Sequence, residues 1–95
     1  MKEIFELALS TARRWGLDWY SRGHMGHTIG PGPRGEQPPF ISAAEEGVFE
    51  PNMVICLEAP LYVGGLGGFQ IEEKILITEN GYEFLITLPR EMMEI

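Results

Sequence analysis

Four side chains with metal-binding or proton-transfer chemistry stand out in the sequence: His24, His27, Glu58 and Glu72. The two histidines lie three positions apart, just before the glycine- and proline-rich stretch "GPGPRGEQPP". Each glutamate interrupts a run of apolar residues. A carboxylate in such a run faces water or is neutralised by a cation or hydrogen bonds, because an unpartnered buried charge is strongly destabilising. What these residues do therefore depends on whether the fold brings them together.

A structural explanation stays open for each of them. Alternation along the second apolar run places Gln70, Glu72 and Lys74 on one face, so solvent exposure alone explains Glu72. Both faces of the run around Glu58 are apolar, which suggests a ligand or a buried hydrogen-bond network. A lone histidine such as His27 is more often structural than a ligand, unless carboxylates lie beside it.

Length and composition limit the kinds of function that this chain can have. The 95 residues make at most one domain, 1–95, with a thin core. Seven Lys and Arg against 14 Asp and Glu, a net charge of −7, disfavour binding to nucleic acid or anionic lipid. The single Cys56, inside an apolar run, indicates a buried, inert thiol. No run approaches the roughly 20 apolar residues of a membrane span, and acids interrupt the N-terminal stretch, so we expect no membrane association and a cytoplasmic location.

Local patterns predict the elements that must position these side chains. Apolar residues at helical spacing predict an amphipathic helix over 2–15, with Met1, Ile4, Phe5, Ala8, Ala12 and Trp15 on its apolar face. Gly16 is a natural stop for this helix. Four prolines and three glycines between 30 and 39 predict a loop.

The second half of the chain has strand patterns. Ser42 and Glu45 form a capping-box pattern that predicts one short helical turn, and a further turn is expected at Pro51 and Asn52. Apolar, β-branched runs over 53–63 and 68–78 predict strands, and Asn80-Gly81 predicts a hairpin to a third strand. The fold class is therefore α+β, with an N-terminal helix packed on a mainly antiparallel sheet.

Three motifs follow one another along the chain: "GHTIG" at 26–30, "ICLEAPLY" at 55–62 and "GGFQIEEKILITENGYEFLITLP" at 67–89. Together they resemble the C-terminal half of the pita-bread metallopeptidases, which include Xaa-Pro dipeptidase, Xaa-Pro aminopeptidase, methionine aminopeptidase and creatinase. The family pattern is approximately GHGIG, EPGxY, and RxED before a hydrophobic strand and DGxExL. The resemblance covers about residues 20–89 and implies a curved sheet, half of a pita-bread fold.

The resemblance also implies a metal centre. In the family, the motif histidine and two motif glutamates bind two metal ions, and they match His27, Glu58 and Glu72. Imidazole and carboxylates suit Mn²⁺, Co²⁺, Fe²⁺ or Zn²⁺, and two such ions can activate a water for attack on a peptide carbonyl. Glu72 would bridge the ions, and Glu58 would be the catalytic residue that manages the proton of that water. His24 matches no family position, and we expect it and Arg34 to contact substrate.

The departures from the family pattern limit what this chain can do. The family's ligand set includes two upstream aspartates, whereas the only aspartate here is Asp18. Arg34 and Gly35 stand where the family has a substrate-binding histidine, Gln70 replaces the arginine of RxED, and Leu61 replaces the glycine of EPG. We therefore expect an incomplete divalent-metal site.

Two functions from different classes fit this pattern. The first is the C-terminal part of a metal-dependent Xaa-Pro peptidase-like hydrolase, acting on a peptide or small amide and inactive alone. The second is a non-catalytic, metal-free binding or assembly module. The expected partner is a missing N-terminal half or a second copy of the chain, because the thin core and apolar sheet favour a homo-oligomer.

Overall fold

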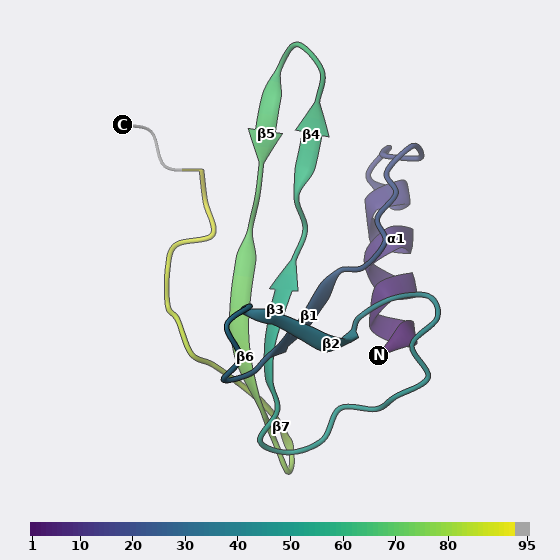
Figure 1. Cartoon of the computed structure of the whole chain (residues 1–95). Coiled ribbons are helices and arrows are strands. Elements are labelled where there is room, and N and C mark those ends of the chain that lie inside the picture. Colours follow the sequence, from purple (N-terminus) through teal and green to yellow (C-terminus); the bar gives the residue numbers. More distant parts are fainter. Residues whose placement is uncertain (93–95) are drawn as a thin grey trace.

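The structure, a computed structural model, describes residues 1–92, which form one helix and seven strands (Figure 1). The elements are α1 (Lys2–Arg14), β1 (Gly26–Ile29), β2 (Glu36–Phe40), β3 (Val54–Glu58), β4 (Leu61–Val63), β5 (Gly67–Phe69), β6 (Glu72–Thr78) and β7 (Gly81–Phe84).

Five of these strands form one antiparallel sheet in the order β2-β1-β3-β6-β7, so β2 and β7 are its edges. β4 and β5 pair only with each other and project as a ribbon beyond the ends of β3 and β6 (Figure 1). The helix lies to one side of the sheet. The expected α+β class, a helix against an antiparallel sheet, is confirmed.

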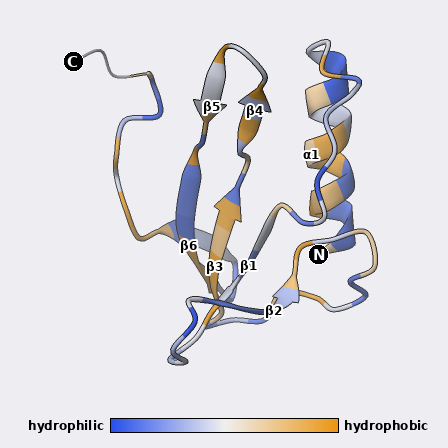
Figure 2. Cartoon of the chain, turned by 45° about the horizontal axis from the view of Figure 1, so that its top comes forward, coloured by the Kyte–Doolittle hydropathy of each residue, from blue (hydrophilic) through white to orange (hydrophobic). Residues whose placement is uncertain are grey.

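The helix begins and ends close to the predicted positions. Gly16 adopts a φ of 85°, and its N–H donates to the carbonyl of Arg13 while the N–H of Leu17 donates to Ala12, which is a glycine-terminated C-cap. Hydrophobic and hydrophilic residues alternate around α1 (Figure 2). Phe5 is buried, but Trp15 is 83% exposed, so its expected place on the packed face is wrong.

A small core joins the helix to the sheet. Its buried side chains come from α1, from β3 and β6, and from the segments that flank β1 and β2: Met1, Phe5, Met25, Ile41, Ile55 and Ile75. The hydrophobic colouring of β3 in Figure 2 matches its central position in the sheet. No helix within residues 1–92 is long and apolar enough to cross a membrane.

The loop predicted over 30–39 is too long, because β2 begins at Glu36 and contains Pro38 and Pro39. Proline removes a backbone donor, which an edge strand tolerates on the side that has no partner. The two prolines also bulge from the ladder, since His27 pairs with Phe40 whereas Thr28 pairs with Gln37. The Thr28 hydroxyl, 2.7 Å from the carbonyl oxygens of Gln37 and Pro38, ties this bulge to β1.

Three further expectations are corrected in detail. Residues 42–47 form a turn and no helix, and the Glu45 carboxylate accepts from the N–H of Gly47 at 2.7 Å. The predicted strands over 53–63 and 68–78 are each broken in two, at 59–60 and at 70–71. The turn at Pro51 and Asn52 and the final hairpin are confirmed, with Glu79 and Asn80 as the loop of that hairpin.

Candidate metal centre

One face of the sheet gathers the acidic and imidazole side chains. His27 pairs across the strands with Cys56, and Glu58 pairs with Glu72. Because side chains alternate along a strand, all four project from the same face. Glu36 joins them, since it pairs with Ile29, two residues beyond His27 on that face. Four neighbouring strands, β2, β1, β3 and β6, therefore each contribute one candidate ligand, in that order.

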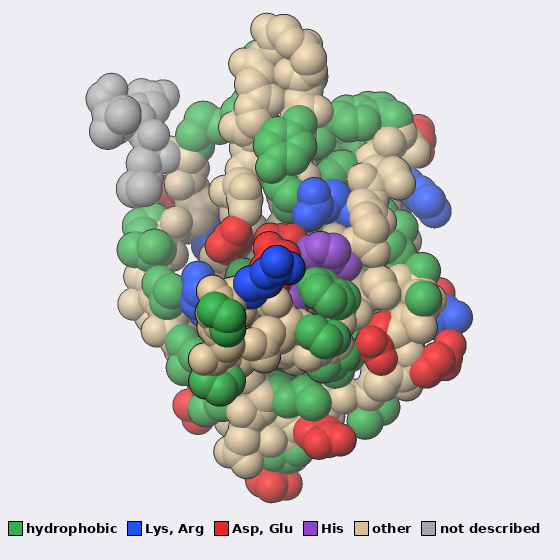
Figure 3. All heavy atoms as spheres, in the orientation of Figure 1, with side chains coloured by type: hydrophobic (Ala, Val, Ile, Leu, Met, Phe, Trp, Pro, Cys, Tyr) green, Lys and Arg blue, Asp and Glu red, His purple; other side chains and the backbone are tan. Residues whose placement is uncertain are grey.

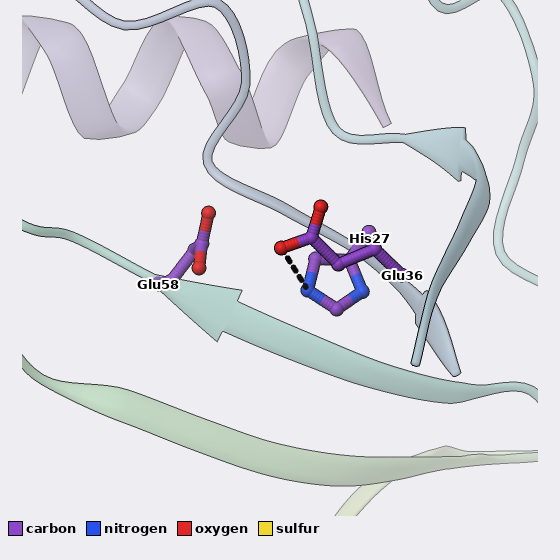
Figure 4. Close-up of side chains that lie close together, drawn as sticks. All are labelled: His27, Glu36 and Glu58. Carbon is purple, nitrogen blue, oxygen red and sulfur yellow. Dashed lines mark ion pairs between the residues drawn. The ribbon is translucent and has the colours of Figure 1, made fainter. Parts of the chain in front are cut away.

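His27 is buried, with 6% of its surface exposed. Its Nδ1 lies 3.0 Å from the carbonyl oxygen of Thr28. A carbonyl only accepts, so Nδ1 is the donor in this hydrogen bond, and in the neutral ring Nε2 then carries the lone pair. Nε2 lies 4.0 Å from Oε1 of Glu36, the contact drawn in Figure 4. This contact is an ion pair when the ring carries both protons, and in the neutral ring the same nitrogen can coordinate a cation.

Glu58 completes this group. One potential ligand atom each from His27, Glu36 and Glu58 lies within 4.8 Å of the other two. Figure 4 shows the Glu36 carboxylate over the His27 ring and the Glu58 carboxylate at the end of β3 on the same side. Glu36 was not among the sequence candidates, because it lies in the stretch predicted as a loop. If residues 36–40 had been predicted as a strand that pairs with "GHTIG", Glu36 would have been placed on the same face of the sheet as His27.

The Glu58 carboxylate is nearly buried, with 10% of the side chain exposed, and it has a counter-charge. Nη2 of Arg22 lies 3.1 Å from Oε1 of Glu58, and Nδ1 of His24 lies 3.6 Å from the same oxygen. Nε of Arg22 and Nδ1 of His24 are buried without a hydrogen-bond partner in the described part of the chain. Figure 3 shows the histidines in the middle of this face beside acidic and basic side chains.

Glu72 lies outside the group of three. Its side chain is 40% exposed and accepts a hydrogen bond from the Gln70 amide. Nζ of Lys74 and Sγ of Cys56 each lie 4.0 Å from its Oε2. The structure therefore brings His27 and Glu58 together and leaves Glu72 as the cross-strand neighbour of Glu58. His24 joins the group through Glu58, whereas Arg34 is exposed in the loop between β1 and β2.

Two titratable groups border the site. Cys56 is buried as predicted, and burial first, then the nearby Glu72 carboxylate, raises the pKa of its thiol. The Tyr20 hydroxyl donates to the carbonyl of Pro60 at 2.9 Å. Burial raises the pKa of Tyr20, while the Arg22 charge opposes that rise. Both groups are therefore held in their neutral form at neutral pH, which leaves the carboxylates and imidazoles as the ionisable chemistry of this face.

Comparison with known proteins places this geometry among peptidases. The profile of metallopeptidase family M24 matches residues 1–79. The chain is 36% identical over 92 residues to Xaa-Pro dipeptidase of Pyrococcus furiosus, a match that covers 97% of this chain and 26% of that protein. It superposes on the prolidase of Pyrococcus horikoshii with a TM-score of 0.84 at 33% identity, over 97% of this chain and 26% of that one.

A second enzyme gives a similar result. The X-Pro aminopeptidase of Thermotoga maritima matches with a TM-score of 0.83 at 31% identity, covering 95% of this chain and 25% of that one. The chain thus spans about a quarter of the length of the relatives it matches. The fold is that of part of a pita-bread domain.

Proposed function

The chain belongs to metallopeptidase family M24, and from this premise we propose that it supplies one side of a divalent-metal hydrolase centre through His27, Glu58 and Glu72. Because the chain spans about a quarter of its relatives, we propose that it corresponds to the C-terminal half of a catalytic domain. Two aspartates from outside the chain would complete the ligand set, so that the chain is inactive alone.

The observation that carries this proposal is the convergence of His27 and a nearly buried Glu58 on one face of the sheet. The residues fit a divalent ion, because the Nδ1 hydrogen bond of His27 leaves Nε2 free to coordinate and the carboxylates supply hard oxygen ligands. Bound ions would supply Lewis-acid activation of a peptide carbonyl and of a water molecule. Mn²⁺ is our first choice among Mn²⁺, Co²⁺, Fe²⁺ and Zn²⁺.

This chain's own residues would bind substrate and handle the proton. Nη2 of Arg22 and Nδ1 of His24 lie 3.1 Å and 3.6 Å from Oε1 of Glu58, so these two groups would hold the Glu58 carboxylate in place as the proton acceptor. His24 and Arg34 are our candidates for contacts to a peptide or small amide, an Xaa-Pro dipeptide by analogy with the relatives. A homo-oligomeric state and a cytoplasmic location are further predictions.

A second function, a metal-free binding or assembly module, is favoured by one feature of the site. Arg22 already neutralises Glu58, and Glu72 already has Gln70 and Lys74 as partners. These contacts satisfy both carboxylates without an ion. In the metal-free module, Arg22 and Lys74 would remain the partners of Glu58 and Glu72. In the hydrolase, metal ions would take their place beside these two carboxylates.

A chimera separates the two functions. The chain would replace the equivalent quarter of the Pyrococcus furiosus Xaa-Pro dipeptidase, and its assembly would be checked by size-exclusion chromatography. We expect hydrolysis of an Xaa-Pro dipeptide with Mn²⁺ or Co²⁺, lost in Glu58→Gln and Glu72→Gln but kept in Glu79→Gln, which removes the same charge from the exposed β6–β7 turn. An assembled, metal-loaded chimera without activity would leave only the binding module.

A further inference from the structure

We propose that Glu36 is a specificity residue that binds the α-ammonium group of a dipeptide substrate. The inference rests on the proposed function, which places peptide hydrolysis beside His27 and Glu58, and it adds a substrate contact that the proposed function does not include. The ligand class is a dipeptide with a free N-terminus. Glu36 would select it over the same compound without its amine.

Glu36 is the carboxylate of this face that has no basic side chain to neutralise it. The carboxylates of Glu58 and Glu72 each have one, an Arg at 3.1 Å and a Lys at 4.0 Å. Among residues 1–92, the one ion-pair contact of Glu36 is Nε2 of His27 at 4.0 Å. If His27 binds a metal ion, as the proposed function has it, the charge of Glu36 is left for a cationic group of a ligand.

The distance of Glu36 from the other two residues selects the α-ammonium group over a basic side chain. One side-chain atom each of His27, Glu36 and Glu58 lies within 4.8 Å of the other two. The α-nitrogen of a substrate lies about 2.5 Å from the carbonyl carbon of the same residue. A carboxylate that binds this nitrogen at about 2.8 Å is therefore at most about 5 Å from the reacting carbon. The end of a lysine or arginine side chain lies several bonds farther out.

The start of β2 holds Glu36 in this position. The side chain of Gln37 fills the space in which a Cβ on Gly30 or Gly32 would stand, so it packs on the loop that precedes β2. Because side chains alternate along a strand, Glu36 projects from the opposite face, the face of His27 (Figure 4). The Glu36 side chain is 63% exposed, so a ligand can reach it from solvent.

Kinetics of the chimera with two compounds test this contact: Ala-Pro as substrate, and propionyl-proline, which is Ala-Pro without its amine, as competitive inhibitor. We expect Glu36→Gln to raise KM for Ala-Pro about tenfold, with kcat within about threefold, because one charge-assisted hydrogen bond is lost. The inhibition constant of propionyl-proline should not change. Glu36→Asp keeps the charge and should recover part of the affinity. Glu79→Gln removes the same charge from an exposed turn and should behave like the unmodified chimera.

An unchanged KM for Ala-Pro in Glu36→Gln would overturn the inference. Equal weakening of both compounds would also overturn it, because Glu36 would then act on the whole site and not on the amine. A larger effect on Lys-Pro than on Met-Pro would assign Glu36 to a basic side chain and contradict the α-ammonium contact.

An assembled but inactive chimera would contradict the proposed function and still decide this inference. Calorimetry then gives the dissociation constants of Ala-Pro and propionyl-proline directly. We expect Ala-Pro to bind about tenfold more tightly, and to lose this advantage in Glu36→Gln. Equal affinities for the two compounds in the unmodified chimera would overturn the role of Glu36.

Discussion

Among the single residues, Arg22 supplies the counter-charge of the Glu58 carboxylate in the metal-free chain. The guanidinium lies 3.1 Å from a carboxylate that the sheet has nearly buried, and without it that charge would be uncompensated. The same position is unfavourable for an approaching cation, because like charges repel strongly where water is largely excluded. Arg22 should therefore stabilise the metal-free chain and oppose metal binding.

Replacing Arg22 by Gln tests both effects. We expect the free energy of unfolding without metal to fall by about 1–3 kcal/mol, the usual cost of leaving a buried group unpaired. The affinity for Mn²⁺ should rise about tenfold, which corresponds to about 1.4 kcal/mol. Arg14→Gln is a matched control, since Arg14 is exposed on α1. Urea denaturation and calorimetry measure the two quantities, and weaker Mn²⁺ binding in Arg22→Gln would show that Arg22 supports the site instead.

Cys56 provides a pH-dependent prediction. Because burial raises the pKa of its thiol in the folded chain, less thiolate is present at pH 8–9 than for a free cysteine. Labelling by a disulfide reagent such as DTNB should therefore be slow in the folded chain and fast in guanidinium chloride. By linkage, this group's contribution to stability is present below the unfolded pKa and is lost as pH rises through the folded pKa. Labelling at the rate of a free thiol at pH 8 would contradict the burial of Cys56.

At the scale of elements, the close contact between β1 and β3 holds His27 in place. Gly26 precedes His27, has a φ of 149°, and faces the Cys56 carbonyl so closely that any Cβ would overlap it. We expect Gly26→Ala to lower the free energy of unfolding by about 2–4 kcal/mol and to displace His27. Gly23→Ala is the matched control, because no atom lies within 4 Å of its Cβ position. Equal urea midpoints for the two variants would contradict this account of β1.

The elements that have local sequence signals are predicted correctly. The elements whose place depends on which strands pair are missed. The helix end at Gly16 and the final hairpin follow from neighbouring residues, and both are confirmed. β2 is missed, because its prolines are tolerated only at a sheet edge, and edges are decided by strands elsewhere in the chain. Glu36 and Arg22 are missed for the same reason, since Arg22 meets Glu58 across 36 positions.

In the molecule as a whole, many apolar side chains remain exposed because the core is small. A groove of about 480 Å³ lies between α1 and the β6–β7 hairpin, on the face of β3 that carries Leu57 and so opposite to Glu58. Ile4, Tyr82 and Phe84 line it and are exposed. Such a surface is characteristic of protein that is normally covered by more protein.

We predict that the isolated chain self-associates through this groove at micromolar concentration. Light scattering coupled to size-exclusion chromatography should give a mass above that of the monomer. Phe84→Glu should reduce it toward the monomer mass, because a charge in the contact must be desolvated. Glu79→Lys, a charge change in the neighbouring exposed turn, is the control. A monomeric mass for the wild type would contradict the homo-oligomer.

We expect the imidazole of His27 and the carboxylate of Glu58 to bind the same metal ion. Anomalous diffraction at the manganese edge, from crystals of the chain grown with MnCl₂, tests it most directly. We expect a manganese peak about 2.2 Å from Nε2 of His27 and from an Oε atom of Glu58. A manganese peak elsewhere on the chain, or none on this face while Arg22 still holds Glu58, would contradict it.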